Sequence, residues 1–309
     1  MSLDKQIWLP VVQDNLFEGR DELAAIATND NIYVVTAGNG IFHKVYIPQA
    51  GDPGQLIINP TEFPLQVSER IDDVLEYQLD HLAMPAKRLG KFDLDKLSYD
   101  KMASVINDKY GRMGEGQLYK TFNNWYIGKE TGKHVETSGA NAVGHAPAAT
   151  GNRKKLVVDD VEKAANILDM QLIPQSERTL LLDSTMFYQL YNDIRTGNHN
   201  IRIIEKDGLQ MLSEPILGFN IVKKSRVIYT TANGTTVRDI YASGAATDIA
   251  VGLALHKSAV TFADGDFEMY VDERNPLYLG GIMSAETWIG GKYRRKDKKG
   301  VVPILHATP

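Results

Sequence analysis

The most constraining feature of this sequence is the stretch 32–82, which combines β-forming side chains with closely spaced prolines. Proline cannot donate to a β-ladder, so it excludes the centre of a sheet and suits an edge strand or a projecting loop. Four prolines fall within 17 positions, at Pro48, Pro53, Pro60 and Pro64. Short strands are expected at residues 32–36, 41–47, 56–58, 64–67 and 74–79, the first two around the turn signal Gly38-Asn39-Gly40.

A hairpin of this kind cannot bury both of its faces. Two strands alone are marginally stable in water, and long exposed edges invite pairing with another chain. The segment therefore either folds back on its own domain or lies across another molecule. Residues 1–30 pose the same problem, because apolar side chains including Trp8, Leu9 and Phe17 alternate with Pro10 and Gly19. We interpret them as an extended arm with a short helical stretch.

A long helix is expected over residues 95–126. Apolar residues recur there at steps of three and four, at Tyr99, Met102, Ile106, Tyr110 and Met113, and again at Leu118, Phe122 and Trp125. The run Gly114-Glu115-Gly116 should kink or end this helix, since each glycine inside a helix costs about 1 kcal/mol relative to alanine. Residues 128–151 are small, polar and rich in glycine, which is typical of a linker and marks the best domain boundary.

A second unit of mixed helix and strand follows from Leu156. A capping box at Asp159–Glu162 predicts one helix, and Asp183 or Ser184 is expected to cap another after a short buried strand at 179–182. Residues 242–263 are apolar and small, and periodicity leaves helix and strand both open there. Further strands are expected at 201–204, 216–222, 226–231, 267–271, 286–289 and 301–305. The predicted fold class is α+β, with helices packed against antiparallel sheets.

Charge and composition narrow the class of function. The chain has no cysteine and a net charge of −5, so disulfides, thiolate metal sites and bulk electrostatic binding of nucleic acid are disfavoured. One segment differs, because residues 292–299 hold six basic side chains and one acid. A solvated turn is the favoured interpretation, although the segment could face a polyanion. A secretory signal and an apolar run long enough to cross a bilayer are both missing, so we expect no membrane partner.

No motif assigns a reaction to this sequence. The seven histidines are scattered, and none has the i, i+4 partner of a helical zinc site. The run Gly128–His134 resembles a phosphate loop, but it is one residue short and lacks the serine or threonine that would hold magnesium. We therefore expect no catalytic residue, no metal and no cofactor. A hydrolase with a catalytic pair split along the chain remains an alternative, and it predicts a monomer or dimer with a polar pocket.

The order of these segments resembles a specific family. The likeness is carried by residues 39–48 at the entry to the proline-bearing loop, residues 99–126 as a long helix, residues 178–187 as a strand-to-helix step, residues 217–222 as a strand with Gly218-Phe219, and residues 254–260. Each motif is loose, and the order is what resembles the family. The chain is similar to the major capsid proteins of tailed bacteriophages, which have the Hong Kong 97-type fold shared with encapsulins.

This resemblance implies a division of the chain into the family's parts. These would be an N-terminal arm at 1–30, an extended β-loop at 31–82, a peripheral domain with the spine helix at 83–155, an axial domain at 156–255, and a return to the peripheral domain at 256–309. The implied function is a coat protein that forms hexamers and pentamers of an icosahedral head around double-stranded DNA. The virion is the expected location, with assembly in the host cytoplasm.

The resemblance also implies partners and contact residues. Other copies of the chain are the main partner, the packaged DNA is expected to be contacted weakly, and a portal is implied. A separate scaffolding protein is expected, because only about thirty residues precede the extended loop. Residues 292–299 would face the lumen or, as we favour, a neighbouring subunit. The predicted subunit-interface residues are Trp8, Leu9, Phe17, Phe42, Lys44, Tyr46, Asp52, Arg70, Arg294 and Arg295. An encapsulin-type shell that packages a cargo enzyme is the alternative within the same fold.

Overall fold

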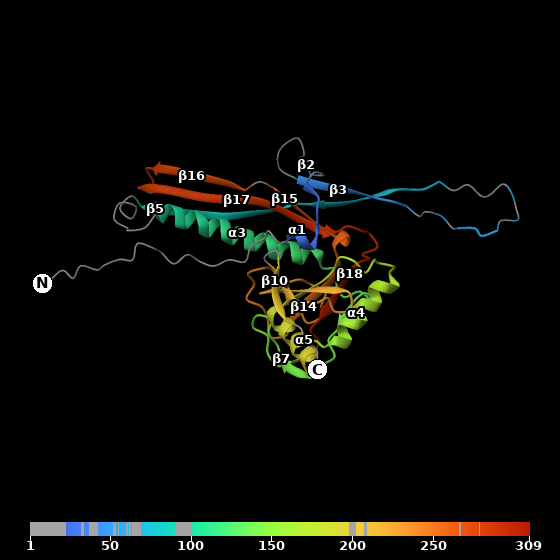
Figure 1. Cartoon of the computed structure of the whole chain (residues 1–309). Coiled ribbons are helices and arrows are strands. Elements are labelled where there is room, and N and C mark those ends of the chain that lie inside the picture. The colour runs from blue at the N-terminus through green and yellow to red at the C-terminus, as the bar shows by residue number, and fades with distance from the viewer. Residues whose placement is uncertain are drawn as a thin grey trace.

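The structure is a computed structural model of the 309-residue chain. It describes residues 23–31, 34–36, 43–51, 54, 56–59, 61, 63, 69–90, 101–197, 202–206, 209–265, 267–277 and 279–309. The fold has three parts: a long layer, a compact lobe under it, and a projecting hairpin that leaves the long layer at one end (Figure 1). Helices pack against sheets in the first two parts, so the predicted α+β class is confirmed.

The long layer consists of one sheet and one helix. The sheet runs β1 (Thr28–Asn29), β15 (Val260–Asp264), β17 (Gly280–Tyr293) and β16 (Glu268–Asn275), and β5 (Asp80–Gly90) also pairs with β17. Alternate residues of β17 are buried, which is the period of a strand with one covered face. The covering element is α3 (Lys101–Trp125), whose Gln117 Nε2 donates to Thr287 Oγ1 at 2.9 Å and whose Trp125 Nε1 donates to the Thr261 carbonyl oxygen at 2.8 Å.

The helix α3 passes through its two glycines without a break. The expected kink or end at Gly114-Glu115-Gly116 is therefore wrong. Leu118, Phe122 and Trp125 are fully buried as their spacing predicted. The intrinsic cost of each glycine is about 1 kcal/mol, and burial of three large side chains in the following turns outweighs it.

The compact lobe is built on an eight-stranded sheet among the described residues. Its order is β10-β11-β12-β9-β14-β18-β6, with β13 also paired to β14. The strands are β6 (Val135–Glu136), β9 (Arg178–Asp183), β10 (Ile203–Lys206), β11 (Leu209–Leu212), β12 (Phe219–Lys224), β13 (Ile228–Thr230), β14 (Ile249–His256) and β18 (Val301–Leu305). Most neighbours are antiparallel, but β12 with β9 and β18 with β6 are parallel.

The lobe sheet is covered on both faces. From β14, Ala250 and Ala254 pack in a cluster with α4 (Val158–Met170) and α5 (Ser184–Thr196), whereas Val251 and Leu253 pack with the C-terminal end of α3. Every residue of β9, β14 and β18 is accordingly buried. Residues 242–263, for which the sequence left helix and strand both open, contain strand β14 and most of strand β15, joined by the 3-10 turn η2 (Lys257–Ala259).

The helix caps of the lobe agree only in part with the sequence. Asp183 caps α5 as expected, with its Oδ1 accepting from the Met186 N–H at 2.8 Å. In α4 the N-cap is Val157, and Asp160 reaches back to accept the Val157 N–H at 3.3 Å. The helix therefore begins one residue before the predicted capping box, and Asp160 rather than Glu162 closes the turn. The segment 128–151, expected to be a linker, contains β7 (Asn141–Val143), which pairs with β8 (Asn152–Lys154) just beyond its end.

The projecting hairpin comprises β2 (Val34–Thr36), β3 (His43–Gln49) and β4 (Asp73–Gln78), in the order β2-β3-β4. Pro48 lies in β3, the middle strand, where a central position had been excluded. It is tolerated because, among the described residues, β2 pairs with β3 only as far as Val45, so Pro48 has β4 on one side and no described ladder on the other. Between β3 and β4, the described residues lie far out from the body (Figure 1).

The end of the chain departs from the expected division. Residues 256–309 were assigned together to a return into the peripheral part, but β18 pairs with β14 inside the lobe sheet. The C-terminus lies at the end of the lobe farthest from the long layer (Figure 1). Only the part of this segment that contains β15, β16 and β17 lies in the long layer.

Candidate assembly surface

The base of the projecting hairpin is anchored to the long layer. Along β3 and β4, Val45, Ile47, Leu75 and Tyr77 are buried in a small cluster with Leu79 and Ala263, and Trp288 packs against it. Tyr46 and Val74 point to the opposite face and are about half exposed. The alternation expected of a half-buried strand therefore holds at the base, with one face on the body and one face open.

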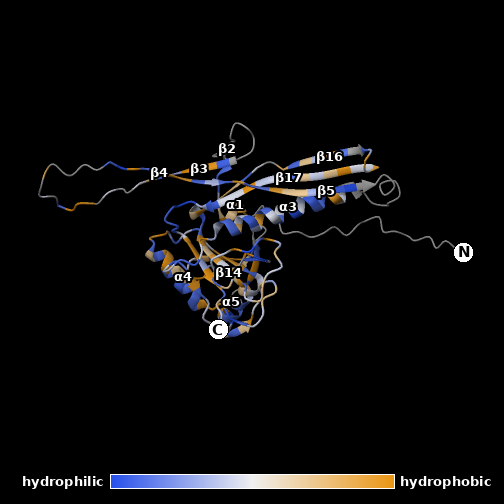
Figure 2. Cartoon of the chain, turned by 180° about the vertical axis from the view of Figure 1, so that it is seen from behind, coloured by the Kyte–Doolittle hydropathy of each residue, from blue (hydrophilic) through white to orange (hydrophobic). Residues whose placement is uncertain are grey.

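The outer part of the hairpin has no such cover. Its described apolar side chains are between 55% and 89% exposed: Leu56, Ile57, Ile58, Phe63 and Ile71. Figure 2 shows hydrophobic stretches on this part of the chain, well away from the body. Apolar side chains gathered on an exposed segment mark an interaction site, because a monomer rarely leaves such a surface open.

Two predicted interface residues, Arg70 and Lys44, form ion pairs with acids of the hairpin, and a bond between Gly51 and Asp72 joins its two sides at the neck. The Arg70 Nε donates to Asp72 Oδ1 at 2.6 Å, and the Gly51 N–H donates to the same oxygen at 2.9 Å. The hydrogen bond from Arg70 is the main reason why the pKa of Asp72 falls to about 2. Lys44 lies 3.8 Å from Glu76 on the paired strand. Lys44, Tyr46 and Arg70 thus lie on the exposed hairpin, while Trp8, Leu9, Phe17, Phe42 and Asp52 lie outside the described residues.

The basic segment 292–299 is paired with acids of the same chain. Arg294 lies 3.3 Å from the buried carboxylate of Asp30, and Arg295 lies 2.9 Å from Asp297. Lys296 pairs with Asp73 at the base of the hairpin, and Lys292 Nζ donates to the Glu76 carbonyl oxygen at 3.2 Å. The segment therefore joins the hairpin to the body. Whether Arg294 and Arg295 also contact a neighbouring subunit stays a prediction.

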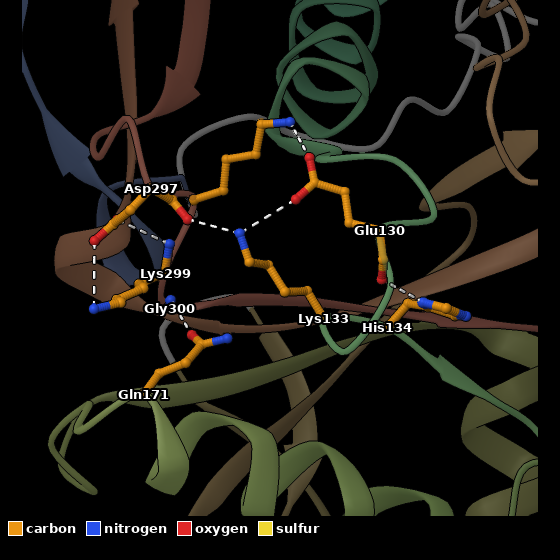
Figure 3. Close-up of polar contacts among 8 residues, drawn as sticks. Glu130, Lys133, His134, Gln171, Asp297, Lys299 and Gly300 are labelled. Carbon is orange, nitrogen blue, oxygen red and sulfur yellow. Dashed lines mark hydrogen bonds and ion pairs between the residues drawn. The ribbon is translucent and has the colours of Figure 1, made fainter.

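The end of this segment meets the loop that follows α3 (Figure 3). The Glu130 carboxylate accepts from Lys298 and, at 3.2 Å, from Lys133, whose Nζ also donates to the Asp297 carbonyl oxygen at 2.9 Å. The hydrogen bond from Lys298 lowers the pKa of Glu130, and the bond from Arg295 lowers that of Asp297. Sequence reasoning missed this network because Glu130 and Lys298 are 168 positions apart.

The same network explains the run that resembled a phosphate loop. In Figure 3 His134 lies beside Glu130, and its ring Nδ1–H donates to the Glu130 carbonyl oxygen at 2.6 Å. The Gly300 N–H donates to Gln171 Oε1 at 2.9 Å, which ties the turn to the end of α4. The side chains of the run bind one another and the basic turn, which is a structural role.

Three observations bear on catalytic, metal and membrane chemistry in the described part of the chain. No group of three histidine, aspartate or glutamate side chains is placed there to hold a metal ion. Among the described helices, none combines the length and apolarity that crossing a bilayer requires. An open groove between β5 and α3 is lined mostly by apolar side chains such as Leu82, Met84 and Met113, and its titratable or charged side chains include His81 and Arg112. The hydrolase alternative predicts a pocket with convergent polar groups, whereas this lining is mainly apolar.

Comparison with known proteins identifies the fold. No family model and no curated protein sequence matches this chain. Solved structures do match, over almost the full length. The capsid of Helicobacter pylori bacteriophage KHP30 is 13% identical with a TM-score of 0.63, and covers 99% of this chain and 96% of its own. The capsid of Ralstonia phage GP4 is 10% identical with a TM-score of 0.62, over 99% and 96%.

An encapsulin is also similar, but less completely. The encapsulin complex from Synechococcus elongatus is 12% identical with a TM-score of 0.55, and the match covers 89% of this chain and 84% of that one. All these identities are low, so the likeness concerns the fold. The chain has the Hong Kong 97-type fold of phage capsid proteins, as the order of its sequence segments predicted.

Proposed function

We propose that this chain is the major capsid protein of a phage and assembles into hexamers and pentamers of an icosahedral head around double-stranded DNA. The main support is the near-complete overlap with phage capsid structures, in which the projecting hairpin is included. The role is structural rather than enzymatic. The virion is its proposed location, with assembly in the host cytoplasm.

The parts of the fold then take the family's roles. The projecting hairpin is the extended loop, α3 is the spine helix of the peripheral domain, and the compact lobe is the axial domain, with residues 1–30 as the arm. The apolar side chains of the hairpin support this assignment, because they are exposed in a single copy and an adjacent copy would cover them. Obligate assemblies bury more than about 2,000 Å² per contact, and we expect contacts between copies of this chain to reach that size.

The proposed interface residues divide into three groups, which belong to the hairpin, to the arm and to the base of the hairpin. Lys44, Tyr46 and Arg70 lie on the hairpin, with Phe42 and Asp52 beside them in the sequence, and Trp8, Leu9 and Phe17 belong to the arm. Arg294 and Arg295 lie where the hairpin meets the body. They would affect a neighbouring copy either by setting the direction in which the hairpin projects or by contacting that copy at the base of the hairpin. A mutation in either of the first two groups should weaken assembly more than it weakens folding.

The proposed partners other than sister copies follow from the family. They are a separate scaffolding protein, a portal and the packaged DNA. The ion pairs of residues 292–299 support weak contact with DNA, because their acids already neutralise much of the positive charge.

An encapsulin-type shell is the second candidate. It rests on the similarity to the Synechococcus elongatus encapsulin, which has the same fold and lower coverage. The two functions differ in what the particle contains: a capsid encloses genomic DNA and an encapsulin encloses a cargo protein. Nuclease-protected DNA in particles from the native source would support the capsid, and a single co-purifying enzyme would support the encapsulin.

The test is expression of the full chain, alone and with the neighbouring genes, followed by negative-stain electron microscopy. We expect closed icosahedral particles or free hexamers and pentamers. A variant with Leu56, Ile57 and Ile58 all changed to Ser serves as the control, because it should stay folded and not assemble. A wild-type chain that stays monomeric at high concentration with every candidate scaffolding protein would contradict the proposal.

A further inference from the structure

Two histidines and an aspartate form a cluster in the compact lobe, in which His306 and Asp183 are buried and the side chain of His145 is 15% exposed. His145 Nε2 lies 2.6 Å from Asp183 Oδ2, and the rings of His145 and His306 are 4.8 Å apart between centroids. His306 is 1% exposed and Asp183 is 2% exposed. The three residues come from the loop after β7, the junction of β9 with α5, and the residue after β18.

The cluster joins three segments that are far apart in the sequence. Asp183 uses its second oxygen to cap α5 at Met186, so the carboxylate is held from both sides. The His306 N–H donates to the Ala250 carbonyl oxygen at 3.0 Å. The next residue, Ala307, accepts from the Lys154 N–H at 2.8 Å and donates its own N–H to Thr137 Oγ1 at 2.9 Å. The C-terminal segment is thereby attached to β8 and β14.

An extra proton on His306 Nε2 would find no hydrogen-bond acceptor among the described residues. The Nε2 of His306 and the Nδ1 of His145 are both buried without a hydrogen-bond partner among the described residues. The charged groups that face His306 are Asp183, which favours a positive charge, and His145 and Arg153, which oppose it. Tyr229 on β13 also faces Asp183 but stays neutral, because burial raises its pKa to about 12. Burial is the larger effect, since a charge in this interior loses its hydration.

We propose that His145, Asp183 and His306 form a pH-sensitive lock that holds the C-terminal segment 306–309 and the loop 144–151 against the lobe at neutral pH and releases them on acidification. The lock lies within one chain, so it does not depend on the proposed capsid function.

The sign of the effect follows from the burial of His306. Desolvation first, and then His145, lowers its pKa from 6.5 to about 4. An opened segment exposes the imidazole to water and restores the ordinary pKa, so the open form binds the proton more tightly. The closed form keeps its full stability above about pH 6.5 and loses it as the pH falls towards 4. The opening equilibrium should shift on the order of 100-fold across that range.

The test is hydrogen exchange of the unassembled full-length chain between pH 7.5 and pH 4.5, with correction for the intrinsic exchange rate at each pH. In the wild type, we expect protection of residues 144–151 and 306–309 to fall on the order of 100-fold, while β9 and β14 keep theirs. His306→Gln should remove most of this pH dependence, because the amide is uncharged throughout the range. His81→Gln is the matched control, since His81 is 40% exposed on the long layer, and it should behave as wild type.

Two results would overturn the proposal. One is a parallel loss of protection in His306→Gln and wild type. The other comes from histidine-labelled wild-type chain and needs no variant, so it also decides the case if His306→Gln does not fold. In that nuclear magnetic resonance titration, we expect one buried histidine to remain neutral below pH 5 in the folded signal. A full set of histidines that all titrate near 6.5 would show that His306 is not held in the lock.

Discussion

The compact lobe and the projecting hairpin both contain apolar side chains, but these are buried in the lobe and largely exposed on the outer part of the hairpin. In the lobe, β9 and β14 are buried at every position because helices cover both faces of the sheet. On the hairpin, only the base is covered, and Leu56 is 89% exposed. Apolar content therefore stabilises the subunit in one region and leaves surface for other molecules in the other. Subunit folding and subunit association should be separable by mutation.

The largest expected effect comes from shortening the hairpin. The chain returns on itself at its neck, where Gly51 bonds to Asp72, so residues 52–70 can be replaced by Asn-Gly. We expect the thermal midpoint of the subunit to stay within a few degrees and particle formation to be lost. Circular dichroism and electron microscopy measure the two quantities. Particles of normal size from this variant would remove the proposed role of the hairpin.

A pair of leucine substitutions makes the comparison quantitative. Leu180→Ala in β9 should lower the free energy of unfolding by about 2–5 kcal/mol, because it leaves a cavity in a fully buried site. Leu56→Ala should change it by less than about 0.5 kcal/mol, since the side chain is exposed. Denaturant titration measures the stability, and light scattering measures assembly, which only Leu56→Ala should impair without unfolding. Equal loss of stability in both variants would contradict the distinction.

Two glycine substitutions compare the open helix surface with the lobe core. Gly114→Ala should stabilise the subunit by about 0.5–1 kcal/mol, because an added Cβ meets no atom within 4 Å and the helix gains propensity. Gly252→Ala in β14 should destabilise it, since its Cβ would lie 2.7 Å from Leu182 Cδ2 and 3.3 Å from the Leu181 carbonyl oxygen. Thermal unfolding of both variants checks the signs. A destabilising Gly114→Ala would mean that α3 needs the glycine.

The smallest effect is expected from the ion pair that joins the hairpin to the body. Lys296→Gln should lower the thermal midpoint of the subunit by at most about 2 °C, because Lys296 and Asp73 are both exposed. The hydrogen bond from Lys296 lowers the pKa of Asp73, so this contribution is present at neutral pH and is lost as the pH falls through that pKa. Lys44→Gln provides the control on the hairpin itself. A fall of ten degrees would show that the basic segment supports the whole fold.

Much of the secondary structure could be predicted from local sequence patterns. Asp183 or Ser184 was expected to cap a helix after a buried strand, and the structure shows Asp183 in that role through its bond to Met186. The spacing of Leu118, Phe122 and Trp125 predicted the buried face of α3. The prediction of a break at Gly114 and Gly116 was wrong, because helix propensity includes the cost of each glycine and omits the packing of the buried side chains in the neighbouring turns. The position of β18 was also missed, since its partner β14 lies about fifty residues away.

For the candidate surface too, local features could be predicted from the sequence and long-range contacts could not. The sequence by itself indicated that residues 32–82 carry apolar side chains that a two-stranded hairpin cannot bury, because prolines and strand alternation act over a few residues. Whether the segment folds back on its own domain or projects was decided only by the tertiary structure. The sequence could not decide that the cations of 292–299 would be met by Asp30, Asp73 and Glu130, or that His145 and His306 would share one buried site. Those contacts join positions more than a hundred residues apart, and only the packing of the folded chain brings such charges together.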